Sequence, residues 1–275
     1  MEKVVGIGSK QEQQAFIERH GTFFDSWPDL KWCVERAFLR DITAQSDADP
    51  LIFYLGRRCF DDFMEILTLA ANGHGFGAMT LLRSMYERAV TDAYLHLQPN
   101  EAAQFRDYHF IQRAKLANAI EETIGAGTMN EETVANVRAE AATVRDRYLV
   151  PHCEHCTRTR VNHSWTRLSF VAMAQKVAEA DHRETGTDGS IGDLLVHAYY
   201  LPLEHAHSTL ASATHRLRVD ADELQFLDDV PHEIGDEAFR TARLVLLHVL
   251  QLQARHFPEL HDLLEPLNTY AAGLD

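Results

Sequence analysis

Apolar residues recur every three to four positions along most of this chain, and the segments that carry them begin and end at capping residues. The first long segment begins at Asp49 and Pro50 and ends at Asn72 and Gly73. Pro is favoured in the first turn of a helix and Gly just after its end, so this segment is expected to be one helix. Its expected buried stripe consists of Leu51, Tyr54, Leu55, Cys59, Phe63, Ile66 and Leu69.

A second long segment follows at once, from about Gly75 to Leu97, and the short turn predicts an antiparallel helical hairpin. Further helices are expected downstream, and Pro202 predicts a kink in one of them. Apart from a short extended piece near Val4, no alternation typical of strands is found. The later helices are expected from Asn100 to about Gly125, Asn130 to about Pro151, Thr166 to about Ala180, Ser190 to about Leu217, Asp236 to about Phe257, and from Pro258 onward.

These patterns predict an all-α fold, a multi-helix bundle with a long antiparallel helical hairpin and a kinked long helix. The chain contains no solenoid-type repeat and no low-complexity linker, so a single domain over residues 1–275 is expected. Within it we expect N-terminal helices in 1–47, a core bundle in 48–217 and an acidic C-terminal helical segment in 218–275.

The composition indicates a globular protein and limits the kinds of partner that it is expected to bind. Hydrophobic residues make up 45% of the chain and charged residues 24%, as in an ordinary globular domain. Few cysteines, no signal peptide and no long apolar run predict a cytoplasmic protein that does not enter membranes. A net charge of -15 disfavours nucleic acid as a general partner, because phosphates repel such a surface. Only the locally basic segment 145–167 is compatible with nucleic-acid binding.

Residues 151–165 break the helical pattern and contain a concentration of metal-binding residue types. Two cysteines separated by two residues can chelate one tetrahedral Zn²⁺, and nearby histidines can complete the shell. A redox dithiol is the other use of this spacing, although it normally accompanies a βαβ pattern that the chain lacks. The candidate zinc ligands are His152, Cys153, His155, Cys156 and His163.

Two enzyme hypotheses rest on other spacings of charged residues. Arg158 and His163 fit R-x-x-x-x-H, the arrangement of the helical HEPN ribonucleases, in which Arg steadies a phosphate and His moves protons. Such an enzyme would cleave RNA without metal, as a toxin or phage-defence effector. The E-x-x-H pairs at 179–182 and 204–207, with Glu65 and Glu87, instead fit a di-metal carboxylate oxidase inside a helical bundle.

The sequence Leu81-Leu82-Arg83-Ser84-Met85-Tyr86-Glu87, with Tyr200 and His207 downstream, resembles a bacterial family of unknown function, DUF5677. The resemblance covers about residues 48–217. It implies an all-α fold and a polar cluster formed by Arg83, Glu87, Tyr200 and His207. In this chain Glu204 replaces the serine of the family's second motif.

The leading hypothesis is an intracellular ligand-binding or regulatory helical protein, whose pocket lies between the Arg83 helix and the His207 helix. Zinc would clamp the loop beneath this pocket. The expected partner is a small molecule or another protein, and a homo-oligomer is compatible with the sequence. The competing hypothesis is the ribonuclease, with either Arg158 and His163 or Arg83 and His207 as its working pair.

Overall fold

The computed structural model describes residues 10–125, 127–153, 157–185, 190–206, 217–220, 223–226 and 232–273. The structure confirms the all-α multi-helix fold, with only short strands beside the helices. The α-helices are α1 (Lys10–Arg19), α2 (Gly21–Phe38), α3 (Asp49–Ala71), α4 (Gly75–Leu97), α5 (Ala102–Thr123), α6 (Glu131–Val144), α7 (Phe170–Thr185), α8 (Leu201–Ala206), α10 (His232–His256) and α11 (Leu264–Ala272).

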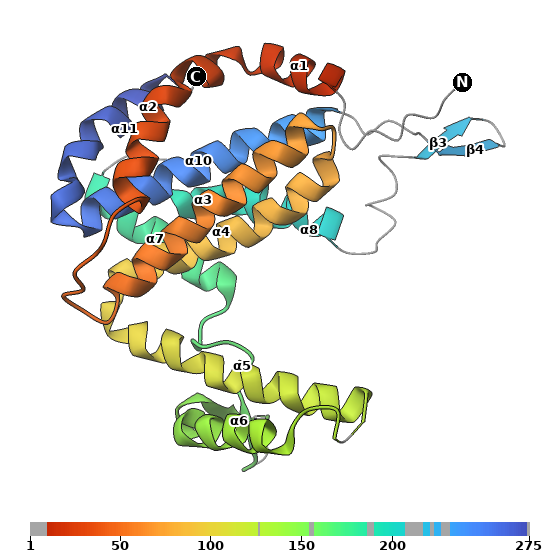
Figure 1. Ribbon diagram of the computed structural model, residues 1–275, viewed down its shortest axis with the longest axis vertical. Helices are drawn as coiled ribbons and strands as arrows, with labels where there is room; N and C mark the ends of the chain where they lie inside the picture. Colours follow the sequence, from red (N-terminus) through yellow and green to blue (C-terminus); the bar gives the residue numbers. More distant parts are fainter. Residues whose placement is uncertain are drawn as a thin grey trace.

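Helices α3, α4 and α10 pack against one another and form the centre of a bundle, as Figure 1 shows. The turn between α3 and α4 places Gly73 at a φ of 76°, and the amides of Gly73 and His74 bond to the carbonyls of Ala70 and Leu69. This arrangement is a Schellman motif, which glycine favours because it has no Cβ. The predicted antiparallel hairpin of α3 and α4 is therefore confirmed, with its turn at Gly73.

The three central helices approach most closely at their glycines. A Cβ atom on Gly75 would lie 2.7 Å from the backbone nitrogen of Gly235, which would be a severe clash. Gly235 in turn lies against Ala70 at the end of α3. Small residues thus allow the backbones of α3, α4 and α10 to meet.

Helices α1, α2 and α11, with the 3₁₀ turn η5 (Pro258–Leu263), cover one side of α10. Phe16, Phe23 and Phe239 are fully buried there and meet edge to face. The expectation that Asp236 opens the long C-terminal helix is wrong, because α10 already begins at His232. Asp236 is instead buried inside the helix, where Arg19 and His20 bind its carboxylate at 2.8 and 2.9 Å.

Helix α7 lies on the other side of α4. Beside it runs a helical segment that changes from 3₁₀ to π to α geometry along its length. The 3₁₀ turn η3 (Ile191–Leu194) is followed by the π-helical turn η4 (Val196–Tyr200) and by α8. Ser190 opens this path as predicted, through a capping box with Asp193. The expected kinked long helix is corrected to these short pieces up to residue 206, and the remainder of that prediction, 207–216, lies outside the described residues.

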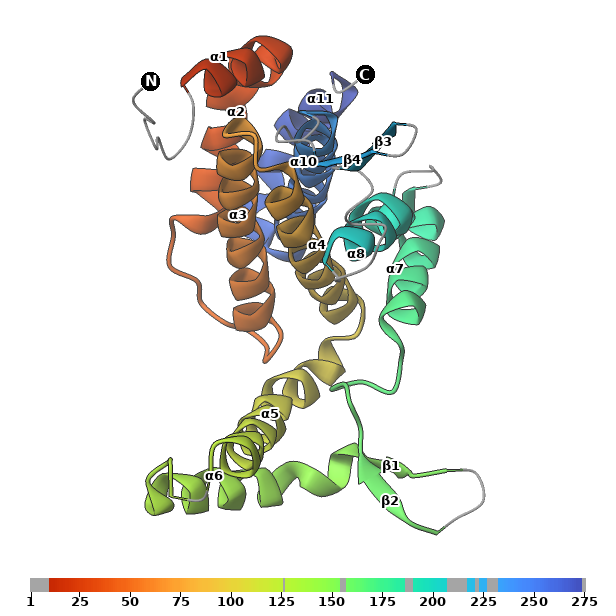
Figure 2. The same cartoon turned by 90° about the vertical axis from the view of Figure 1, so that its right-hand side faces the viewer.

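Helices α5 and α6 and a β-hairpin form a lobe that extends away from the bundle (Figure 2). Asn130 caps α6 as predicted, whereas the short 3₁₀ turn η1 (Pro99–Glu101) precedes α5 and Asn100 caps nothing. Helix α6 ends at Val144, earlier than expected, and is followed by the 3₁₀ turn η2 (Arg145–Tyr148).

The expectation of no strands after residue 4 is wrong. Strand β1 (Leu149–Pro151) pairs antiparallel with β2 (Thr159–Val161), so the interruption at 151–165 is largely a hairpin. A second hairpin joins β3 (Leu217–Asp220) to β4 (Glu223–Phe226). Within the described residues, no helix is long and apolar enough to cross a membrane.

Candidate functional site

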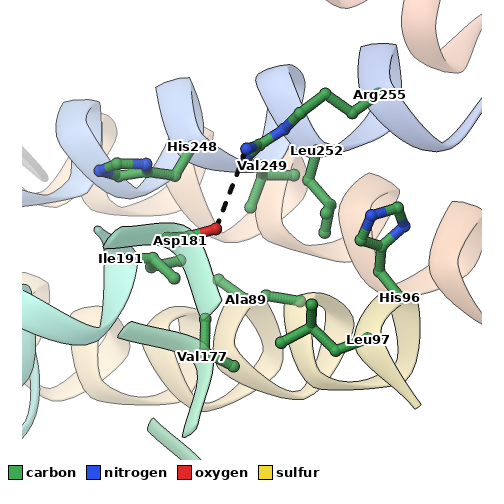
Figure 3. A pocket seen from close by; sticks show the side chains of 11 residues that line it. Ala89, His96, Leu97, Val177, Asp181, Ile191, His248, Val249, Leu252 and Arg255 are labelled. Carbon is green, nitrogen blue, oxygen red and sulfur yellow. Dashed lines mark ion pairs between the residues drawn. The ribbon is translucent and has the colours of Figure 1, made fainter. Parts of the chain in front are cut away.

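A narrow cavity lies between α4, α7, η3 and α10, and its walls combine aliphatic side chains with four ionisable groups (Figure 3). Its volume is about 20 Å³, enough for about one water molecule. His96 comes from the end of α4, Asp181 from α7, and His248 and Arg255 from α10. In Figure 3 the two histidines lie on either side of the Arg255–Asp181 ion pair.

Hydrogen bonds connect His96 through His256 to Asp49. Its Nδ1 lies 2.9 Å from Nδ1 of His256, and Nε2 of His256 lies 3.1 Å from Oδ1 of Asp49 at the start of α3. Burial disfavours the Asp49 carboxylate, but hydrogen bonds from Ser46, Gln45 and His256 outweigh it and lower the pKa of Asp49. Asp49 is therefore an ionised acceptor that orients His256.

These partners determine which nitrogens carry hydrogen when both rings are neutral. Since Asp49 only accepts, His256 donates from Nε2 and its Nδ1 is left as an acceptor. His96 must then donate from Nδ1, so its Nε2 carries a lone pair. His96 thus offers a proton acceptor on the ring edge opposite His256.

The two cavity histidines are uncharged at neutral pH. Burial, together with the neighbouring His256 and Arg255, lowers the pKa of His96 to about 4, and Asp181 opposes this shift. Burial also lowers the pKa of His248 to about 4, again against the effect of Asp181. Perturbed ionisable groups in a cavity are typical of functional sites, although structural networks produce them too.

Arg255 lacks hydrogen-bond partners within the described residues, although its guanidinium is half-buried. Its Nη1 lies 3.9 Å from Oδ1 of Asp181, too far for a hydrogen bond, and its buried Nε has no partner within the described residues. The other oxygen of Asp181 accepts a hydrogen bond from the Ser190 hydroxyl at 2.7 Å. Arg255 can therefore still donate hydrogen bonds.

Together these groups supply a proton acceptor and a positively charged donor in one enclosed space. An acidic group that enters can transfer its proton to His96 while Arg255 binds the resulting anion. On the far side of the His96–His256 pair, Asp49 and His256 line an open groove of about 650 Å³ with Arg40 and Glu259. The histidine pair thus separates an enclosed cavity from an open one.

The cluster expected from the family motifs is formed in part. Arg83 and Glu87 pair through Nε and Oε1 at 3.0 Å, with 24% and 41% of their side chains exposed. The guanidinium lies 4.7 Å from the centre of the Tyr199 ring, so its aromatic partner is Tyr199. Tyr200, the tyrosine that we expected there, is 44% exposed, and His207 lies outside the described residues.

The candidate zinc ligands fall on the β1–β2 hairpin. His152 and Cys153 are exposed near its turn, where the His152 amide bonds to the Arg158 carbonyl at 2.9 Å. His163 follows β2 at the opposite end of the hairpin, so the structure does not bring it to the turn. His155 and Cys156 lie outside the described residues.

Within the residues that the structure describes, which exclude His207, the two enzyme spacings are not assembled as their chemistry requires. Arg158 and His163 are exposed at the two ends of a strand, whereas the ribonuclease pattern needs both on one helix face. Glu65 and Glu179 are exposed. Among the residues that the structure describes, no group of three or more His, Cys, Asp or Glu side chains is arranged to hold a metal ion.

The cavity residues form no local sequence motif, because they come from distant parts of the chain. Asp49 and His256 are separated by 207 positions, so no local spacing connects them. One signal was present, since His248 interrupts the most apolar stretch of the chain, Leu244 to Leu252. A histidine within an apolar stretch is expected to be at least half-buried in a helical bundle, so its partners are worth identifying.

The fold and this cavity define an all-α helical bundle with an ionisable cluster between its central helices. The chain belongs to the family of unknown function DUF5677, whose family model matches residues 49–224. That region contains Asp49, His96 and Asp181, whereas α10 with His248, Arg255 and His256 lies beyond it. No curated protein and no solved structure matches the chain.

Proposed function

We propose that this chain is a ligand-binding protein that takes up a small carboxylic acid at the cavity between α4, α7 and α10. The observation that carries the proposal is the Arg255 guanidinium, which lines the cavity and has no hydrogen-bond partner in the described residues. A planar carboxylate matches the fork of N–H donors on arginine. Because the volume of the cavity is about that of one water molecule, the surrounding side chains must move apart to admit the carboxylate.

The neighbouring charges restrict the ligand further. Asp181 lies beside Arg255 and repels a second negative charge, so a monoanion is favoured over a dianion such as phosphate. His96 and His248 are neutral before binding, and an anion beside them raises the pKa of both. Anion binding is therefore accompanied by proton uptake, with His96 as the acceptor because its Nε2 carries a lone pair on the ring edge opposite His256.

The other two functions considered for this chain have less support. The metal-independent ribonuclease needs an arginine and a histidine on one helix face, and Arg158 and His163 flank a strand. The di-metal oxidase needs four inward carboxylates, and Glu65 is exposed. Neither hypothesis is favoured by an observation at these residues.

Calorimetric titration with acetate in two buffers of different ionisation enthalpy tests the proposal. At neutral pH we expect a measurable fraction of a proton to be taken up per bound acetate, because binding raises a pKa that starts at about 4, and no binding of acetamide, which has the same shape without the charge. Arg255→Gln should weaken acetate binding at least about tenfold, and His96→Gln should abolish proton uptake. Arg240→Gln is the matched control, because Arg240 lies on the same helix but is 59% exposed.

Equal acetate affinity in the wild type and in Arg255→Gln would overturn the proposal. So would acetate binding without proton uptake, or acetamide binding as tight as that of acetate. Circular dichroism and urea unfolding of each variant separate a lost ligand contact from a lost fold.

A further inference from the structure

Another arginine of α10, Arg243, forms no ion pair within the described residues and lies on the side of α10 that α2 and α11 cover. The half-buried Arg243 projects between α2 and α11, with its guanidinium carbon 5.0 Å from the centre of the Phe23 ring and 6.0 Å from that of Tyr270. Its Nη2 donates to the Tyr270 hydroxyl at 3.3 Å, and its buried Nε has no partner among the residues that the structure describes. Within the described residues, no carboxylate forms an ion pair with it.

Arg243 lines a groove of about 690 Å³ between α2 and α11, a volume within the range of small-molecule sites. The hydroxyls of Ser26 and Thr269 and the phenol of Tyr270 contribute polar atoms to the same groove. The indole of Trp32 also lines it and is 46% exposed, an unusual exposure for so large an apolar surface.

Three carboxylates line this groove as well, and they differ in how they are paired. Asp262 is bound by Arg36 at 3.1 Å and is thereby largely neutralised. Asp29 and Glu265 form no ion pair within the described residues. The groove therefore combines one unpaired cation, held among aromatic rings, with two unpaired anions in its exposed wall.

This distribution of charge selects a class of ligand. A half-buried guanidinium without a counter-ion is unfavourable, and aromatic faces compensate it only in part, so an anionic group is attracted to Arg243. The same groove attracts a positive group to Asp29 and Glu265, and an apolar body can pack on Trp32. A purely anionic or purely cationic molecule satisfies only one half of the groove.

We propose that the groove between α2 and α11 binds a zwitterion of the amino-acid class with an apolar side chain. Its carboxylate pairs with Arg243, its ammonium group lies near Asp29 and Glu265, and its side chain covers Trp32. The site is separate from the histidine cavity, because Arg243 and Arg255 are more than three helical turns apart, about 18 Å along α10.

Three related probes separate the contributions of the two charges. Phenylalanine carries both charges, N-acetylphenylalanine only the carboxylate, and phenylalaninamide only the ammonium group. Binding is followed by tryptophan fluorescence of the full chain, and Trp32→Phe identifies which of the 3 tryptophans reports it. We expect phenylalanine to bind at least about tenfold more tightly than either blocked form.

Charge-removing variants provide the decisive comparison. Asp29→Asn with Glu265→Gln should weaken phenylalanine and phenylalaninamide but leave N-acetylphenylalanine unchanged or slightly tighter. Both positions are exposed, so these substitutions should not impair folding. Arg243→Gln should weaken the two carboxylate-bearing probes, and Arg240→Gln on the same helix should weaken none.

Several outcomes would overturn the proposal. One is equal affinity for all three probes, which would indicate apolar contact alone; another is a fluorescence change that persists in Trp32→Phe. The absence of phenylalanine binding at millimolar concentration would also refute it. Acetate binding at the histidine cavity is measured separately, so failure at one site leaves the other result intact.

Discussion

The interior of the bundle and the β1–β2 hairpin contain the same residue types in opposite environments. His96 and His248 are enclosed by α4, α7 and α10, and burial lowers the pKa of each to about 4. His152 and His163 are exposed on the hairpin, although they lie within 12 residues of sequence that also contain two cysteines. The comparison teaches that burial with few partners, and not crowding in the sequence, creates unusual chemistry.

The largest expected effect is a loss of stability in acid caused by His96 and His248, the two half-buried histidines of the cavity. Their folded pKa of about 4 is below the ordinary value of 6.5, so the unfolded chain binds more protons between these values. The free energy of unfolding should therefore fall as the pH drops from about 6.5 to about 4, by up to about 3 kcal/mol for each histidine. Urea unfolding at several pH values measures this slope.

Substitutions sharpen the same comparison. The double variant His96→Gln, His248→Gln should be less sensitive to pH over this window, because neither glutamine gains a proton. His163→Gln should retain the wild-type slope, since His163 is exposed on the hairpin. If the double variant and His163→Gln show the same slope, the cavity histidines do not control the acid response.

A smaller effect is expected from a single methyl group placed between the central helices. In Gly75→Ala the new Cβ would lie 2.7 Å from the Gly235 nitrogen and 3.2 Å from Cβ of Ile234, so α4 and α10 must move apart. We expect a loss of about 1–3 kcal/mol in the free energy of unfolding. Gly21→Ala is the control, because nothing lies within 4 Å of its added Cβ, and urea unfolding that gives equal stabilities would contradict the close approach.

The smallest effect on the bundle is expected from the hairpin, even if it binds zinc. We propose zinc at its turn through Cys153 and Cys156 with His152 or His155, and elemental analysis of untagged protein tests this. Cys153→Ser with Cys156→Ser should lower the zinc content from about one equivalent to below about a tenth, with little change in bundle stability because the lobe lies apart. Wild-type protein with less than about a tenth of an equivalent would exclude zinc.

Much of the helical framework could be predicted from the sequence, because its signals are local. Pro50 and Gly73 mark the ends of α3, and Asn130 caps α6 through the amide of Thr133 at 3.1 Å. The prediction that Asp236 caps a helix was wrong, because an aspartate before an apolar run looks like a cap whether or not Arg19 binds it. Distinguishing the two cases requires a partner 217 positions away.

The irregular parts of the fold were harder to predict for a related reason. Pro202 has no amide hydrogen, and the sequence indicates only that the helix is disturbed near it, not that the turn before it becomes π-helical. The strands of β1 and β2 have three residues each, too few to show an alternating pattern. Their pairing decides that His163 lies far from the hairpin turn.

The sequence by itself determined the class of fold, the α3–α4 hairpin and the family, because helix periodicity, capping and short motifs are properties of neighbouring residues. Only the tertiary structure brought Asp49, His96, Asp181, His248, Arg255 and His256 together. The packing of α10 against α3 and α4 also decided which of sixteen histidines are deprived of water. Desolvation and hydrogen-bond partners depend on what surrounds a side chain in space, and residues far apart in the chain supply those surroundings.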